Sequence, residues 1–343
     1  MDLWNYLKQT TKPIVLYGMG NGADKIISVL NRYDIKISGV FASDGFVRQK
    51  IFHGFLVTDY KTAKATFGDM IVLVCFGSAL PDVIANIKRI ASEQELYAPD
   101  VPVYGDVLFN DEYVKQNKER LQRVYNMLAD DCSKKVFECA VMYKLTGKID
   151  YLFECETPIQ EIYKNILKFS NNETYFDLGA YRGDTVEEFL SVVCNYNKII
   201  AVEPDKKTYK KLCAATETVE NIENINACIS EIDGEIPFEM NGSRGSTIGS
   251  SSDTMTSVTV DTLSTKNIPT YIKMDIEGAE SAAIRGGAKT FSTYKPAMQI
   301  AAYHRSEDLI QIAEDVLNLR GDYKVYLRHF PSLPCWDMSY YFI

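Results

Sequence analysis

The sequence is poor in histidine and tryptophan, with three and two in 343 residues, and it contains no apolar run of about 18 residues that could span a membrane. Positive charge is also in short supply: 37 Lys and Arg stand against 46 Asp and Glu, a formal net charge of -9. Such a deficit argues against a broad phosphate-binding surface. Neither a membrane span nor a nucleic-acid partner is expected.

Paired cysteines are missing as well. The eight cysteines are scattered, lack Cys-x-x-Cys spacing and mostly fall inside apolar patterns, as reduced buried thiols do. The first residues lack a basic start followed by an apolar stretch, which disfavours secretion. These features predict a cytoplasmic protein whose cysteines are structural.

The length and composition, 46% hydrophobic and 24% charged, predict about two packed units. Strand and helix patterns alternate over residues 1–110, where we predict a Rossmann-like α/β accessory domain. Helix formers dominate residues 111–168, the predicted helical connector. Residues 169–343 return to alternating strands and helices and form the predicted main domain.

A glycine turn, Gly18-Met-Gly-Asn-Gly22, stands between a predicted strand and a predicted helix. Its glycines either cradle a phosphate or only allow a tight turn, and the sequence leaves both readings open. The segment resembles the small Rossmann-like domains found ahead of sugar-modifying enzymes. A nucleotide-sugar bound at this N-terminal domain is therefore a hypothesis.

Four polar side chains of the main domain each follow a different predicted strand: Asp177, Glu203, Asp275 and His304. Ligands of open parallel sheets bind at the carboxyl ends of the strands, so these four side chains should meet at one crevice. Gly179 would let a ligand approach the backbone closely. The sequence thus predicts a pocket for a nucleotide-like cofactor.

Two other features of the main domain carry expectations. Residues 230–257 are rich in Gly and Ser and too polar to fill a core, so we predict a mobile loop or lid. This loop would help to select the molecule on which the protein acts. Lys273 is expected to form a structural ion pair rather than to act in catalysis.

Several motifs occur together in residues 170–343. They are Asp-Leu-Gly-Ala-Tyr-Arg-Gly-Asp-Thr at 177–185, Glu203-Pro-Asp205, Val260-Asp-Thr-Leu263, Ile272-Lys-Met-Asp-Ile-Glu-Gly-Ala-Glu280, and a His after the fifth strand. With them the segment resembles the FkbM family of S-adenosylmethionine-dependent methyltransferases. The resemblance implies an α/β fold, a Rossmann-like class I methyltransferase three-layer sandwich with a mixed seven-stranded sheet, preceded here by the smaller Rossmann-like domain and the helical connector.

The resemblance also implies S-adenosyl-L-methionine as the cofactor and a role for each pocket residue. Glu203 would bind the ribose hydroxyls, and Asp177 would face the methionine ammonium group. The adenine would lie beside Ala227 and Cys228. The remaining implied cofactor contacts are Gly179, Ala180, Tyr181, Gly183, Asp184, Thr185, Pro204 and Asp275.

Methyl transfer to oxygen requires alignment of the acceptor and removal of its proton. Asp275 and His304 are the candidate catalytic bases, with a hydrogen-bonded structural role as the alternative for His304. Asp275, Glu277 and His304 lack strict metal-ligand spacing, and no metal is expected.

The sequence therefore predicts an S-adenosylmethionine-dependent O-methyltransferase that acts on a hydroxyl of a sugar or sugar-containing acceptor, either a small molecule or a glycan. Two alternatives stay open. One is a nicotinamide-dependent sugar-nucleotide enzyme that uses the Gly18–Gly22 turn, and the other is a non-catalytic scaffold that only binds the cofactor.

Overall fold

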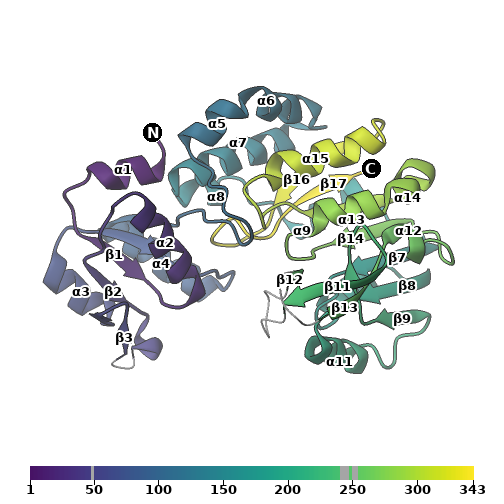
Figure 1. Ribbon diagram of the computed structural model, residues 1–343, viewed down its shortest axis with the longest axis horizontal. Coiled ribbons are helices and arrows are strands. Elements are labelled where there is room, and N and C mark those ends of the chain that lie inside the picture. Colours follow the sequence, from purple (N-terminus) through teal and green to yellow (C-terminus); the bar gives the residue numbers. More distant parts are fainter. Residues whose placement is uncertain (48–49, 240–246, 249–253) are drawn as a thin grey trace.

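The computed structural model describes residues 1–47, 50–239, 247–248 and 254–343. Two α/β parts lie side by side, and a group of helices that connects them in sequence lies across their upper edge in Figure 1. None of the helices in the described part of the chain combines the length and the apolar character that crossing a bilayer requires.

The N-terminal part consists of strands and helices in alternation. Its elements are α1 (Leu3–Gln9), β1 (Ile14–Tyr17), α2 (Asn21–Arg32), β2 (Gly39–Phe41), η1 (Asp44–Phe46), β3 (Ile51–Phe52), β4 (Phe55–Leu56), α3 (Tyr60–Phe67), β5 (Ile71–Val74), α4 (Pro81–Glu93) and β6 (Glu95–Tyr97). Four strands pair in parallel in the order β2-β1-β5-β6. Alternate residues face opposite sides: Leu16 packs with α1 and α2, and Val15 lies in the apolar cluster that contains α3 and α4.

The helical segment follows. Its elements are α5 (Asp111–Gln116), α6 (Lys118–Met127), α7 (Asp131–Thr146), α8 (Asp150–Phe153), α9 (Ile159–Glu161) and the π-helix η2 (Ile162–Leu167). The first helices of the predicted connector are divided at Asn117, because that residue leaves the helical region with φ -105° and ψ 13°. Its side chain instead donates to the Tyr113 carbonyl and ends α5.

The C-terminal part is larger. Its elements are β7 (Glu173–Leu178), α10 (Asp184–Val192), β8 (Tyr196–Val202), α11 (Lys206–Ala215), β9 (Ile222–Ile225), β10 (Cys228–Ile229), β11 (Gly234–Glu239), β12 (Thr247–Ile248), β13 (Thr254–Val258), α12 (Val260–Leu263), β14 (Tyr271–Met274), α13 (Glu280–Gly286), α14 (Ala288–Tyr294), β15 (Ala297–Ala301), α15 (Asp308–Leu319), β16 (Val325–His329) and β17 (Met338–Phe342).

Seven of these strands form one mixed sheet in the order β16-β17-β15-β14-β7-β8-β9, with β17 antiparallel to both of its neighbours. Helices cover both faces. Tyr175 and Ile199 pack with α10 and α11, whereas Phe176 and Ile200 lie in the cluster that contains α12 to α15. This three-layer arrangement confirms the predicted Rossmann-like class I methyltransferase fold.

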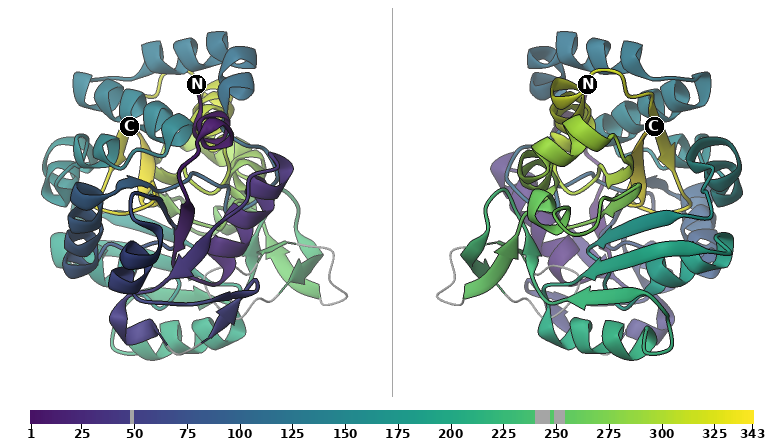
Figure 2. Two further views of the ribbon diagram at one scale, coloured as in Figure 1. Left: turned by 90° about the vertical axis from the view of Figure 1, so that its left-hand side faces the viewer. Right: turned by 90° about the vertical axis from the view of Figure 1, so that its right-hand side faces the viewer.

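The expectation of a loop over residues 230–257 is wrong for the described part of that segment. β11 and β13 pair antiparallel within a second sheet, in the order β10-β13-β11-β12, and Figure 2 shows these strands projecting from the domain. Ile236 and Met255 are buried against Cys228 and give the small sheet its own apolar contact. Residues 240–246 and 249–253 lie outside the described residues, so part of the prediction stays without a structural counterpart.

One apolar cluster extends across all three parts of the described chain. A single cluster of buried side chains includes Val15 of β1, Tyr143 of α7, Phe176 of β7 and Phe342 of β17. The predicted divisions after residues 110 and 168 therefore remain a proposal about folding units, because the core extends across both.

Arg328 of β16 attaches the helical segment to the large sheet. Its side chain is fully buried, with Nη2 2.6 Å from Asp130 and Nε 3.1 Å from Glu161. Nη1 also donates to Ser133 Oγ at 2.7 Å. Burial opposes the charge, but the two carboxylates outweigh this effect and raise the pKa of the guanidinium. The ion pairs therefore hold α7 and α9 against the sheet.

We expect Arg328→Met to lower the free energy of unfolding by about 3 kcal/mol, because the change removes the partner of two partly buried carboxylates. Urea denaturation followed by circular dichroism measures this loss. The matched control is Arg123→Met, which removes an ion pair whose arginine is more than half exposed and should have a much smaller effect. Equal stability of wild type and Arg328→Met would contradict the structural role.

Candidate active site

The register of the parallel strands brings separate chain segments to one edge of the sheet. Leu178 of β7 is paired with Val202 of β8 and with Met274 of β14, and Met274 is paired with Ile300 of β15. The residues that directly follow these four partners therefore emerge at the same level. Chain connections leave β7 and β14 toward opposite sides of the sheet, so the crevice between them is the topological switch point.

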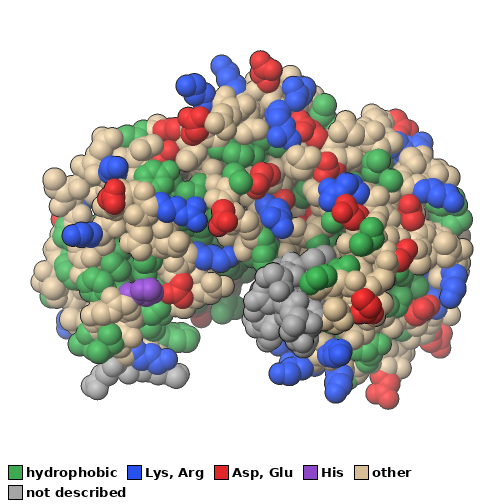
Figure 3. Space-filling view, in the orientation of Figure 1, with side chains coloured by type: hydrophobic (Ala, Val, Ile, Leu, Met, Phe, Trp, Pro, Cys, Tyr) green, Lys and Arg blue, Asp and Glu red, His purple; other side chains and the backbone are tan. Residues whose placement is uncertain are grey.

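A cavity of about 1390 Å³ opens at this edge. Figure 3 shows the molecule hollowed between the N-terminal part and the C-terminal part. Most of the predicted site residues line the cavity: Gly179, Tyr181, Asp184, Thr185, Glu203, Pro204, Ala227, Cys228, Asp275 and His304. The structure thus brings them together. Asp177, Ala180 and Gly183 are not among the described residues that line it.

Asp177 is fully buried and bonded to the protein itself. Thr185 Oγ1 donates to its Oδ2 at 2.5 Å, and Lys273 Nζ lies 3.7 Å from its Oδ1. Asp177 and Lys273 are register partners on β7 and β14, which makes them a cross-strand pair. Burial raises the pKa of Asp177, and Lys273 opposes that shift. The predicted ion pair of Lys273 is confirmed. Asp177 itself does not line the cavity, whereas its partners Thr185 and Lys273 do.

Glu203 follows β8 and has a carboxylate fixed by backbone donors. Tyr181 N donates to its Oε2 at 3.0 Å, and Asp205 N donates to its Oε1 at 2.8 Å. The residue is only 7% exposed, and this burial raises its pKa to about 7, although the two N–H donors work against the rise. A carboxylate oxygen can accept more than one hydrogen bond, so both oxygens can still accept from a ligand.

Gly179 is required by the geometry of the turn after β7. Its φ is +86°, and a Cβ placed there would overlap the Asp275 carbonyl of the neighbouring strand end. Any side chain would push the ends of β7 and β14 apart. Gly179 therefore lets the ends of β7 and β14 stay in contact at the edge of the cavity.

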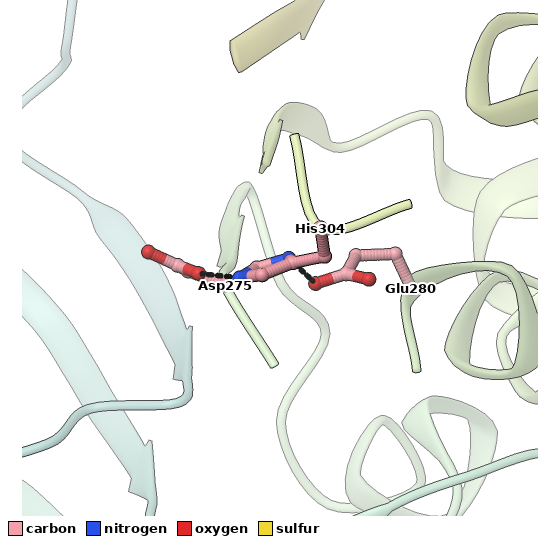
Figure 4. Close-up of side chains that lie close together, drawn as sticks. All are labelled: Asp275, Glu280 and His304. Carbon is pink, nitrogen blue, oxygen red and sulfur yellow. Dashed lines mark ion pairs between the residues drawn. The ribbon is translucent and has the colours of Figure 1, made fainter. Parts of the chain in front are cut away.

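His304 lies between carboxylates on both sides of its ring, as Figure 4 shows for Asp275 and Glu280. Nε2 is 3.3 Å from Asp275 and 3.5 Å from Glu277, and Nδ1 is 2.9 Å from Glu280. Burial alone would lower the pKa of this histidine, but Glu280, Asp275 and Glu277 outweigh burial and raise the pKa to about 10. At neutral pH the ring is then an imidazolium whose two N–H groups face carboxylates, so it cannot take a proton. Asp275 is the remaining candidate base.

Glu280 is the residue that sequence reasoning missed as part of the site. It begins α13, is 1% exposed, and accepts from Ile276 N at 3.0 Å. An acid in the first turn of a helix ordinarily stabilises the helix end at the surface, which hides its role. The signal that could have found it is its place in the same motif as Asp275.

The same cluster has the composition of a cation site. Asp275, Glu280 and His304 each offer a ligand atom within 4.8 Å of the others. However, Asp275 and Glu280 contact opposite nitrogens of one imidazole ring. A single ion cannot bind both nitrogens, so the arrangement suits a protonated ring better than a shared metal.

Packing explains two of the three glycines of the N-terminal turn, Gly18 and Gly22, whereas a Cβ at Gly20 would meet nothing within 4 Å. A Cβ at Gly18 would lie 2.6 Å from a ring carbon of Phe76, and a Cβ at Gly22 would overlap the Cys75 carbonyl. The turn does not contribute to the described lining of the large cavity. Gly18 and Gly22 thus fit the tight-turn interpretation.

Carboxylates dominate the charge of the cavity wall. The acids in the lining are Glu156, Asp184, Glu188, Glu203, Asp205, Asp275, Glu277 and Asp337. Among the described residues, the lining has two Lys or Arg side chains, Lys273 and Arg305, together with His304. The cavity is thus suited to a ligand that carries positive charge or none.

Comparison with known proteins agrees with this geometry. Residues 177–325 match the family model of the methyltransferase FkbM domain, so this segment is similar to the FkbM methyltransferases. The crystal structure of methyltransferase FkbM from Methylobacillus flagellatus KT is 23% identical, with a TM-score of 0.74 over 97% of this chain and 90% of that chain. At that identity the likeness shows the fold alone, including the N-terminal part.

Two further solved structures are more distant. Precorrin-6y C5,15-methyltransferase from Geobacter metallireducens is 12% identical over 51% of this chain and 81% of that chain, with a TM-score of 0.35. Aeropyrum pernix fibrillarin, solved with natively bound S-adenosyl-L-methionine, is 12% identical over 54% and 72%, also at 0.35. Scores this low carry no argument about the present chain. No curated protein matches the sequence.

We expect the two buried histidines to have opposite protonation at pH 7. Burial lowers the pKa of His329 to about 4, so its ring should be neutral, whereas His304 should be protonated with a midpoint near 10. Nitrogen-15 NMR of the imidazole rings measures both midpoints, and His304→Gln and His329→Gln assign the signals. A His304 that titrates near the ordinary value of about 6.5 would contradict the imidazolium assignment.

Proposed function

We propose that the chain is an S-adenosylmethionine-dependent O-methyltransferase that acts on a hydroxyl of a sugar or sugar-containing acceptor. The observation that carries the cofactor assignment is Glu203. Its buried carboxylate is fixed by the N–H groups of Tyr181 and Asp205 at the end of β8, next to the switch point of an FkbM domain. A fixed carboxylate there suits a pair of ribose hydroxyls, which both donate.

The residues around Glu203 fit the rest of the cofactor. Ala227 and Cys228 would flank the adenine, and Gly179 would let the methionine part pass close to the backbone. Asp184 and Thr185, at the start of α10, would bind its polar end. When bound, S-adenosylmethionine supplies an electrophilic methyl group on a cationic sulfonium, and the acidic wall favours that charge.

Asp275 is the proposed base. Its carboxylate lines the cavity, accepts from Tyr303 Oη at 3.1 Å and faces the protonated Nε2 of His304. These donors fix the orientation of the carboxylate that accepts the proton of the acceptor hydroxyl. Glu280 in turn holds the far side of the His304 ring. In this proposal His304 positions Asp275 and does not itself remove a proton.

The size of the cavity supports a second ligand beside the cofactor. Its volume of about 1390 Å³ exceeds the roughly 300–1,000 Å³ of pockets that hold one small molecule. We further propose a cytoplasmic location, which is supported by eight cysteines that are all free. The proposal of a nucleotide-sugar at the N-terminal part is not carried forward, because no residue of the Gly18–Gly22 turn is among the described residues that line the large cavity.

We expect S-adenosylhomocysteine, the demethylated cofactor, to bind about tenfold more weakly at pH 6 than at pH 8. Because the pKa of Glu203 is raised to about 7, the ribose-binding carboxylate is mostly protonated at the lower pH. Isothermal titration calorimetry measures both affinities. The control Glu203→Gln should bind weakly at both pH values, and an equal pH dependence in that variant would show that another group titrates.

We expect Asp275→Asn to keep its affinity for S-adenosylhomocysteine while its methyl transfer falls by about 10² to 10⁴-fold, because the amide cannot accept the proton. Transfer of a radiolabelled methyl group to free sugars and to a glycan hydrolysate measures this loss. The exposed acid change Asp322→Asn serves as a control with wild-type activity. Cofactor binding by the wild type without transfer to any sugar would favour the scaffold alternative instead.

A further inference from the structure

Part of the cavity wall comes from segments outside the parallel strands. Residues 77–79 follow β5, residues 156–159 precede η2, and residues 330–337 connect β16 to β17. Backbone hydrogen bonds tie them together: Ser78 N donates to Leu333 O at 2.7 Å, Leu333 N returns a bond to Ser78 O at 3.0 Å, and Thr157 N donates to His329 O at 2.8 Å. These hydrogen bonds join the segments into one wall.

Trp336 presents an aromatic ring at this wall. It lines the cavity and is 40% exposed, whereas Trp4 is 3% exposed in the core. Gly77 of the N-terminal part lies directly against the ring, so a Cβ there would overlap several ring carbons. The absence of a side chain at Gly77 thus fixes where the indole sits. A large apolar ring that lines the cavity and is partly exposed is a surface for stacking.

The charge around this surface limits what can bind to it. Glu156 and Asp337 belong to the same wall, and carboxylates outnumber Lys and Arg across the described lining by eight to two. Both of those cations already contact protein groups, since Lys273 pairs with Asp177 and Arg305 donates to the Gly278 carbonyl. A phosphate group placed here would meet net repulsion.

We infer that the acceptor is a sugar ring without phosphate, neutral or carrying an amine, whose apolar face stacks on Trp336 while its hydroxyls donate to the surrounding carboxylates. This inference rests on the proposed function and specifies its substrate class. It also gives the N-terminal part a role, because Gly77 and Ser78 position the loop that carries the stacking ring.

The fluorescence of Trp336 can report the binding of a ligand. In the full-length protein with S-adenosylhomocysteine present, tryptophan fluorescence is titrated with methyl glycosides of glucose, galactose, mannose and glucosamine, and with the matching sugar 1-phosphates. We expect the glycosides to change the emission, and the phosphates to bind at least about 10-fold more weakly at low salt, with the gap narrowing as salt is added.

Two variants test the stacking surface by calorimetry. Trp336→Ala should lose about 3- to 10-fold in glycoside affinity, and Gly77→Ala should lose a similar factor because it displaces the indole. Both should bind S-adenosylhomocysteine as the wild type does. Gly45→Ala is the control, since a Cβ at that position meets nothing within 4 Å.

Two results would overturn the inference: no response to any glycoside, or equal binding of glycosides and phosphates. Methyl transfer to some other acceptor would then leave the proposed function standing. Conversely, glycoside binding that depends on Trp336 without any methyl transfer would support the sugar subsite and count against the proposed activity.

Discussion

The structure depends above all on the parallel register that places the ends of β7, β8, β14 and β15 at one level. Leu178 is paired with both Val202 and Met274, so a shift by one residue would turn the side chains of a strand to the opposite face. Gly179 makes the close approach possible, because a Cβ there would meet the next strand end. The proposed site requires the ends of these strands to stay in contact.

Charge at this edge is arranged in pairs around buried groups rather than spread over a surface. Asp177 faces Lys273 within the sheet, and His304 separates Asp275 from Glu280. An isolated buried charge is costly, so each of these groups is stabilised mainly by its partner. A pKa raised to about 10 makes His304 a cation at neutral pH. In the proposed mechanism it therefore orients the Asp275 carboxylate, which takes the proton.

The parts of the fold that could be predicted from the sequence are those with strong local patterns. The apolar strands that end in Glu203 and Asp275 predicted the parallel sheet and the crevice, and both are confirmed. The pairing of β11 with β13 could not be predicted, because Ile236 and Met255 are the buried apolar side chains among the described residues of a largely polar segment. Local propensity gives little signal for such short, mostly exposed strands.

Within the site, sequence reasoning identified residue types but not their surroundings. Glu280 was missed because its contact with His304 arises only when α13 packs beside the end of β15. Asp177 lies near the end of β7 as expected, but its pairing with Lys273 is a property of the strand register. Protonation states also depend on such tertiary contacts, so the raised pKa of His304 has no counterpart in the sequence.

The most direct test of the central claim is a crystal structure of the protein with S-adenosylhomocysteine. The account predicts that both ribose hydroxyls lie within hydrogen-bonding distance of the Glu203 carboxylate, with the adenine beside Ala227 and Cys228. A nucleoside bound away from Glu203, or seated at the Gly18–Gly22 turn, would contradict it.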